Sequence, residues 1–171
     1  MQADLRAALT KALARSRPEY PSSGPVLVLG VGSELRSDDG VGPAIARAVA
    51  ALGLEGLVGM AAGTAPENAT GQLRALKPSH VIIVDAADLG EPPGTVRLLD
   101  PAEAGGNSFA THGLPLSVLA GYIASEIGSE VHLIGIQPLS LEFGESLSAP
   151  VTASVRAVTD ALATALGARR P

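Results

Sequence analysis

The chain has 171 residues, 46% of them hydrophobic, and a formal net charge of −5, which fits one domain with a sizeable core. Cysteine is absent, which excludes disulfides, thiolate metal sites and a cysteine nucleophile. The chain has no basic run and only two Tyr, two Phe and no Trp, which argues against nucleic acid as a partner. Because no run of about 18 apolar residues and no signal-like N-terminal stretch occur, we expect no membrane insertion and a cytoplasmic location.

Residues 3–15 predict an amphipathic helix, and residues 1–24 together form an N-terminal helical extension and linker. The remaining elements are expected in the order strand 26–29, helix 41–52, strand 57–60, helix 66–76, strands 81–84 and 95–99, helix 114–127, strand 131–136 and helix 150–166. The strand at 95–99 is expected to run antiparallel, because only a turn separates it from the strand before it. This alternation predicts a single α/β domain over 1–171, a three-layer sandwich with a mostly parallel, five-stranded twisted sheet and helices on both faces.

The most informative stretch is residues 26–42, where an apolar strand is followed by a glycine-bearing loop, the paired acids Asp38 and Asp39, and a helix. Parallel α/β proteins carry their chemistry at the carboxyl ends of strands, where these acids are expected. Gly30 and Gly32 allow a tight turn and a close approach by another group. Asp is also favoured as a helix N-cap, which explains one of the two acids better than both.

Two further polar residues are expected at the same edge of the sheet. Asp85 ends the apolar strand 81–84, and His112 precedes the helix 114–127, where the helix N-terminus favours neutral imidazole. His80 is expected at the surface, and His132 in a structural role within its strand. Two carboxylates and one imidazole suit a borderline divalent ion such as nickel or zinc, and three protein ligands leave a position open.

Other chemistries fit less well. The loop after Gly30 lacks the third glycine of a dinucleotide fingerprint, and the chain has neither a Gly-Lys-Ser/Thr phosphate loop nor a Gly-x-Ser-x-Gly elbow. A nucleotide- or sugar-phosphate-binding domain therefore stays a minor alternative.

The segment Gly30-Val-Gly-Ser-Glu-Leu-Arg-Ser-Asp-Asp-Gly-Val-Gly42 resembles the opening motif of the nickel-iron hydrogenase maturation endopeptidases. Four further blocks agree in order, and two of them, Ala-Pro-Glu-Asn and Gly-Ile-Gln-Pro, are similar to the subgroup that serves hydrogenase 3 type enzymes. The resemblance covers about residues 25–166, the expected protease core. The blocks are Gly63-Thr-Ala-Pro-Glu-Asn68, Val81-Ile-Ile-Val-Asp-Ala86, Thr111-His-Gly-Leu-Pro-Leu116 and Ile134-Gly-Ile-Gln-Pro138.

The resemblance implies a phosphorylase/hydrolase-like fold and a single cut that removes the C-terminal extension of the nickel-loaded precursor of the hydrogenase large subunit. The family's three metal-contacting and catalytic residues fall on Asp39, Asp85 and His112, with Asp38, Gly63 and Thr64 in support. The resemblance also implies an aspartyl-type endopeptidase that recognises Ni²⁺ presented by the substrate. No permanently bound cofactor is expected, although zinc or cadmium could occupy the site, and we expect a monomer.

Two departures from the family pattern bear on the site. Ser33 stands where the family usually has Asn, and Ala61-Ala62-Gly63 stands where it usually has Asp-Gly-Gly, so a carboxylate is missing. The main alternative is a metal-sensing binding protein, a chaperone that docks on the large subunit without cutting it, since the same three ligands would serve such a protein.

Overall fold

The computed structural model describes residues 2–14, 23–104 and 113–167 of the chain. Its strands are β1 (Val26–Val31), β2 (Leu57–Gly63), β3 (His80–Ala86), β4 (Val96–Leu99) and β5 (Glu130–Ile136). Its α-helices are α1 (Gln2–Ala14), α2 (Val41–Ala51), α3 (Thr70–Leu76), α4 (Leu116–Tyr122) and α5 (Ala149–Gly167). Short 3₁₀ turns are η1 (Ser37–Gly40), η2 (Pro66–Ala69) and η3 (Pro101–Ala104), and a π-helical turn, η4 (Ile123–Ile127), continues α4.

The five strands form one sheet in the order β2-β1-β3-β5-β4, with all pairs parallel except the antiparallel pair β4–β5. The predicted mostly parallel α/β sheet is therefore confirmed. The expected antiparallel strand is also confirmed, since β4 runs antiparallel to the rest of the sheet. Its partner is β5, which lies between β4 and the preceding strand β3. Strand β5 is buried along almost its whole length and suits the sheet interior, whereas β4 has four residues and an exposed Arg97 and suits an edge.

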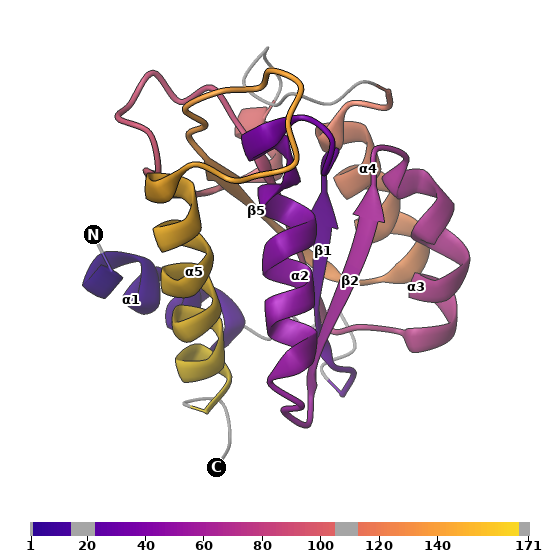
Figure 1. Cartoon of the computed structure of the whole chain (residues 1–171). Coiled ribbons are helices and arrows are strands. Elements are labelled where there is room, and N and C mark those ends of the chain that lie inside the picture. Colours follow the sequence, from indigo (N-terminus) through magenta and orange to yellow (C-terminus); the bar gives the residue numbers. More distant parts are fainter. Residues whose placement is uncertain (1, 15–22, 105–112, 168–171) are drawn as a thin grey trace.

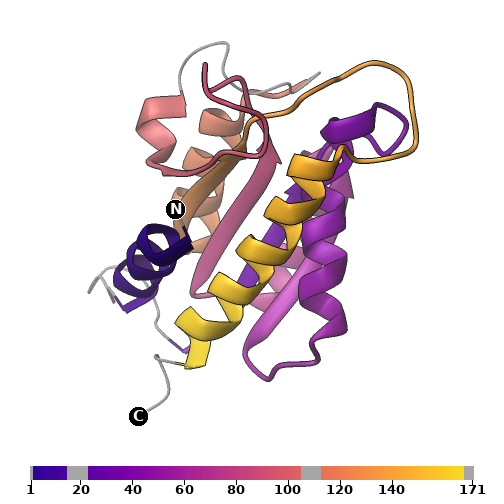
Figure 2. The same ribbon diagram turned by 60° about the vertical axis from the view of Figure 1, so that its left-hand side comes forward.

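Helices cover both faces of the sheet, as Figures 1 and 2 show. Side chains alternate along β1, so that Val26 and Val28 face the layer of α1, α2 and α5, while Leu27 and Leu29 face α3 and α4. Strand β3 lies in the middle and is buried along its whole length, as its apolar sequence predicts. None of the described helices has both the length and the hydropathy that crossing a membrane requires.

The N-terminal helix belongs to the same hydrophobic core as the rest of the chain. Leu5, Leu9 and Leu13 are buried together with residues of α5 such as Leu162. Figure 2 shows α1 lying beside α5. The linker that follows, residues 15–22, lies outside the described residues.

Several elements differ from prediction at their ends. Strand β1 continues through Gly30 to Val31, and β3 includes Asp85 and Ala86, because each strand keeps its parallel partner beyond the apolar run. The helices at 41–52 and 66–76 are each preceded or begun by a 3₁₀ turn. Asp38 and Asp39 thus lie on η1, between the end of β1 and the start of α2.

Candidate functional site

The glycines of the opening motif make room for the chain's own backbone. A Cβ on Gly30 would lie 2.2 Å from the carbonyl oxygen of Gly42, and one on Gly32 would lie 1.8 Å from that of Asp39. Gly32 also has a φ of +129°, a conformation that favours glycine. The close approach predicted from these glycines is therefore made by η1 and α2, which are thereby held against the carboxyl end of β1.

Gly42 sets the position of the helix that follows the two acids. A Cβ on Gly42 would lie 2.2 Å from the carbonyl oxygen of Val31 and 2.4 Å from that of Val84. The first turn of α2 therefore touches the backbones of both β1 and β3, just before Asp85. This contact brings η1, with Asp39, to the end of the strand that carries Asp85.

The side chain of Asp38 binds a loop that is distant in sequence. It is fully buried and accepts four hydrogen bonds, from the N–H groups of Leu139, Ser140 and Ser148 and from the hydroxyl of Ser148. The donor–acceptor distances run from 2.7 to 3.2 Å. Neither η1 nor α2 has a side-chain N-cap, so neither acid fills that role.

Asp39 and Asp85 each use one carboxylate oxygen to accept a backbone N–H. Asp39 Oδ2 accepts the N–H of Ser33 at 2.8 Å, and Asp85 Oδ1 accepts the N–H of Ala86 at 2.8 Å. Asp39 Oδ1 and Asp85 Oδ2 are buried and have no hydrogen-bond partner among the described residues. Each residue is only 1% exposed. Buried acceptors of this kind are costly unless something else satisfies them.

The pKa of Asp85 depends on its burial and on its neighbour Asp39. Burial, and then the neighbouring charge of Asp39, raise the pKa of the Asp85 carboxyl well above its usual value, while the hydrogen bond from Ala86 acts in the opposite direction. The charged form of Asp85 is therefore disfavoured in the absence of a cation. A divalent ion placed between Asp39 and Asp85 would remove that penalty.

Replacing Asp85 by Asn should stabilise the metal-free protein at pH 7, because it removes the cost of ionising a buried carboxyl beside Asp39, about 1.4 kcal/mol for each unit by which the pKa of Asp85 is raised. The folded-state pKa of Asp85 lies above its unfolded value, so its unfavourable contribution is absent below the unfolded pKa of about 3.9 and grows as the pH rises toward the folded pKa. Urea unfolding at pH 3.5 and pH 7 checks this. The gain should vanish at pH 3.5, and the same substitution at exposed Asp88 should show no gain at either pH.

Of the three predicted metal ligands, the structure describes two, Asp39 and Asp85, and both suit a cation. The two buried carboxylate oxygens that lack a partner among the residues described are suitable oxygen ligands for a divalent metal. Within residues 2–14, 23–104 and 113–167, no group of three or more His, Asp or Glu side chains is arranged to hold a metal ion. His112, the predicted third ligand, lies outside the described residues. The three-residue site therefore stays a prediction.

The supporting residues lie where the ends of β1 and β2 meet. Gly63, with a φ of +63°, accepts the N–H of Gly32 at 2.9 Å, and Thr64 is exposed beside it. Ser33 holds Asp39 through its backbone N–H, a bond that any residue but proline can make at this position. The exchange of Asn for Ser at position 33 therefore leaves this bond in place. Ala61 is exposed at the end of edge strand β2, where the family's missing carboxylate would lie.

Gln137, which we did not single out from the sequence, fixes the loop after β3. Its Oε1 accepts the N–H of Leu89 at 2.6 Å and that of Glu91 at 3.3 Å. Its backbone pairs with Thr95 and Gly94. Gln137 lies in the Gly-Ile-Gln-Pro block, and an amide side chain directly after a buried strand is a sequence signal for this role.

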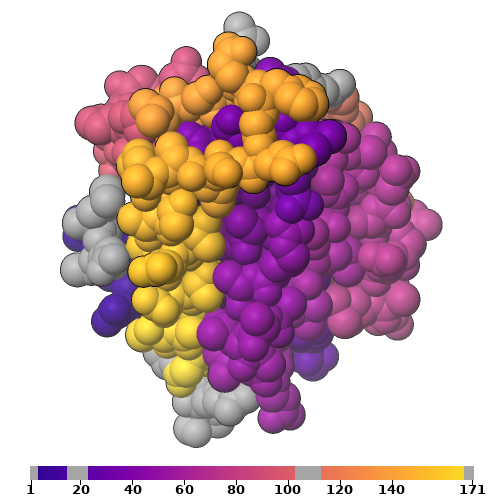
Figure 3. Space-filling model, viewed as in Figure 1, coloured from indigo at the N-terminus to yellow at the C-terminus, as the bar shows by residue number. Residues whose placement is uncertain are grey.

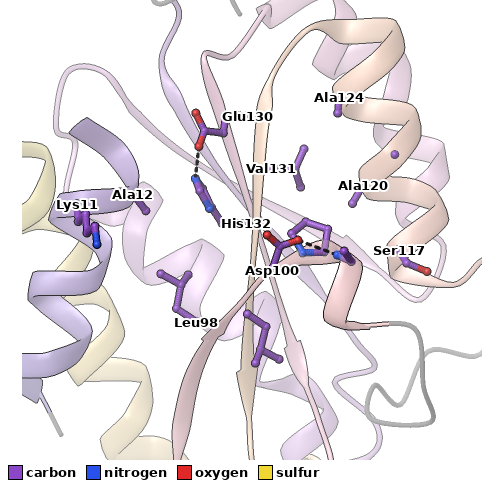
Figure 4. A pocket seen from close by; sticks show the side chains of 14 residues that line it. Lys11, Ala12, Leu98, Asp100, Ser117, Ala120, Ala124, Glu130, Val131 and His132 are labelled. Carbon is purple, nitrogen blue, oxygen red and sulfur yellow. Dashed lines mark hydrogen bonds and ion pairs between the residues drawn. The ribbon is translucent and has the colours of Figure 1, made fainter. Parts of the chain in front are cut away.

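The other two histidines lie together at the opposite end of the sheet. His80, expected at the surface, is only 2% exposed, because it aligns with Glu130 of β5 and its ring stacks on His132 at 6.1 Å. A cavity of about 750 Å³ opens here between α1, α4 and the start of β5, and Figure 4 shows Glu130 and His132 at its wall. Neither Asp39 nor Asp85 lines this cavity.

The fold agrees with comparisons to known proteins. Residues 54–165 match the family model HycI, described as hydrogenase maturation protease. The hydrogenase 3 maturation protease of Escherichia coli K12 is 37% identical over 133 residues, which cover 77% of this chain and 85% of that protein.

Solved structures agree as well. A nickel-iron hydrogenase maturation protease, HycI, from Thermococcus kodakarensis superposes with a TM-score of 0.76 at 31% identity, covering 84% of this chain and 93% of that one. The solution structure of an endopeptidase, HycI, from Escherichia coli gives 0.71 at 36% identity, covering 80% and 87%. The chain belongs to the hydrogenase maturation protease family. It is accordingly a hydrolase of the protease class.

Proposed function

We propose that this protein is an endopeptidase that removes the C-terminal extension from the nickel-loaded precursor of a nickel-iron hydrogenase large subunit. The observation that carries the proposal is the pair of buried carboxylate oxygens at the carboxyl edge of the sheet, Asp39 Oδ1 and Asp85 Oδ2, which have no hydrogen-bond partner in the described part of the chain. Family membership supplies the reaction class, and the name of the Escherichia coli relative supplies a hydrogenase 3 type substrate as the first to test.

In this proposal Asp39, Asp85 and His112 contact nickel that the precursor holds. Oxygen and nitrogen donors suit such an ion, and the protein needs no metal of its own. Nickel in this position would polarise the scissile carbonyl or lower the pKa of a water. The buried position of the two carboxylates keeps bulk water away and strengthens their attraction to the cation.

The remaining steps belong to the chain's own residues. Ser33 orients the Asp39 carboxylate through its N–H, and Ala86 does the same for Asp85, so each presents its second oxygen in a fixed direction. A carboxylate oxygen within reach of the attacking water can accept its proton, as general bases do in peptide hydrolysis. The missing carboxylate at Ala61-Ala62 is proposed to affect the choice of substrate and not the chemistry.

The proposal is tested by incubating the protein with nickel-loaded and nickel-free precursor and reading intact masses. We expect loss of one C-terminal peptide from the nickel-loaded precursor only. The His112→Ala variant should leave both precursors intact. Stable binding of the nickel-loaded precursor without any loss of mass would contradict a protease and support the non-cleaving, metal-sensing chaperone.

A further inference from the structure

Exposed large apolar side chains gather in two loops beside the candidate carboxylates. Leu139 is 61% exposed and Phe143 is 84% exposed, in the loop between β5 and α5, and Leu35 is 52% exposed in the loop after β1. Figure 3 shows the β5–α5 loop, in orange, lying across the segment that carries η1. We call Leu35, Leu139 and Phe143, with the two loop segments 33–37 and 139–144 that carry them, the platform.

The two halves of the platform are bonded to one another. The N–H of Gly144 donates to the carbonyl of Leu35 at 2.9 Å, and the N–H of Ser37 donates to the carbonyl of Gly144 at 2.6 Å. The guanidinium Nε of Arg36 donates to the carbonyl of Leu141 at 3.2 Å. Ser37 adopts a φ of +46°, an uncommon backbone conformation for a residue other than glycine, which these bonds hold in place.

The platform is also fixed to the body of the protein. Asp38 accepts the N–H groups of Leu139 and Ser140 inside the core, and the side chains of Leu141 and Leu147 pack against the main hydrophobic cluster. The loop thus has inward anchors that alternate with outward apolar side chains. Since the backbone is already ordered, covering Phe143 would cost little further conformational entropy.

Acidic residues stand next to the apolar residues in both loops. Glu142 and Glu145 are exposed in the same loop, and exposed Glu34 forms an ion pair with Arg47 next to Leu35. An apolar centre within a charged rim is the usual composition of a protein–protein interface. Phe143 has the size and exposure of an anchoring residue.

We propose that the platform is the docking surface for the folded precursor, which receives Phe143 in an apolar depression lined at its edge by basic side chains facing Glu142 and Glu145. This inference rests on the proposed function. A precursor segment that reaches Asp39 must cover its surroundings, and the platform is joined to Asp39 through the adjacent residue Asp38. Docking on the platform thereby sets the position of the substrate relative to the carboxylates.

The test is the concentration dependence of nickel-loaded precursor processing by the unaltered protein, by Leu139→Ser/Phe143→Ala, and by Leu54→Ser. Leu54 is an exposed leucine, 37% accessible, after the far end of α2, and serves as a matched control. We expect kcat/KM of the double variant to fall by at least about tenfold, the loss that truncating an anchoring aromatic residue produces. The loss should appear in KM, and Leu54→Ser should behave as the unaltered protein.

Binding of the nickel-free precursor, which is not cut, separates this inference from the proposed function. The double variant should bind it at least about tenfold more weakly than the unaltered protein, the loss expected for a truncated anchor. Equal binding by both, or equal kcat/KM, would overturn the docking surface while leaving the protease intact. Absence of cleavage by the unaltered protein would instead overturn the proposed function. Sedimentation showing a dimer that the double variant abolishes would assign the platform to a second copy of this chain and overturn the inference.

Discussion

Replacing Asp39 by Asn is expected to lower the rate of precursor processing by at least about a hundredfold, the upper end of what removing a mere orienting partner of a metal ligand costs. The change replaces a buried carboxylate by a neutral amide, so that Asp85 is the one carboxylate left of the pair. The folded structure should persist, because the amide oxygen can still accept the N–H of Ser33 and the repulsion with Asp85 disappears. Intact mass of the precursor, followed over time, gives the rate.

The control for this loss is the same substitution at Asp88, three residues beyond Asp85 on the same edge of the sheet. Asp88 is exposed and accepts hydrogen bonds from the N–H of Gly90, at 3.2 Å, and from the side-chain amide of Gln137, at 3.5 Å. Asp88→Asn should therefore process the precursor normally. A normal rate for Asp39→Asn, with thermal unfolding unchanged or shifted upward, would remove Asp39 from the site and with it the proposed role of the carboxylate pair.

The order of elements and the class of fold could be predicted from the sequence because they depend on local patterns. Apolar runs of β-branched residues such as Val81–Val84 predict buried parallel strands, and helical spacing of apolar residues predicts the covering helices. The partner of β4 could not be predicted in this way. It depends on which strand competes best for the free edge of β3, a property of the whole sheet.

In the candidate site, too, the features that follow from local sequence could be predicted, and those that depend on distant contacts could not. That Asp39 and Asp85 lie at one edge follows from parallel strands ending together, so their neighbourhood was predictable. That Asp38 binds residues 139–148 was not, since its four hydrogen bonds join segments about a hundred positions apart. Local sequence allows either acid of the pair to face the open edge. Asp38 is bound by the distant loop, and Asp39 is therefore the acid that faces Asp85. The platform could not be predicted for the same reason, since its two segments lie about a hundred positions apart in the sequence.

The close packing of Gly42 against β1 and β3 is expected to hold η1 in place. Gly42→Ala should lower the free energy of unfolding by about 3 kcal/mol or more, the upper range for overpacking a tight contact. The new Cβ would lie 2.2 Å from the Val31 carbonyl oxygen, 2.4 Å from that of Val84 and 2.6 Å from the Val31 nitrogen, and all three are backbone atoms that cannot rotate away. For a chain of this length the melting temperature should fall by roughly 6–12 °C.

Gly71→Ala is the matched control, since Gly71 is an exposed helical glycine of α3 whose added Cβ would meet nothing within 4 Å. It should be neutral or stabilising by up to about 1 kcal/mol, the helix preference of alanine. If Gly42→Ala folds at all, α2 must move outward from β1 and β3, and Asp39 must move with it, away from Asp85. Processing by any folded Gly42→Ala protein should therefore fall as well. A variant with unchanged stability and rate would show that the contact of α2 with the two strands does not hold the carboxylates together.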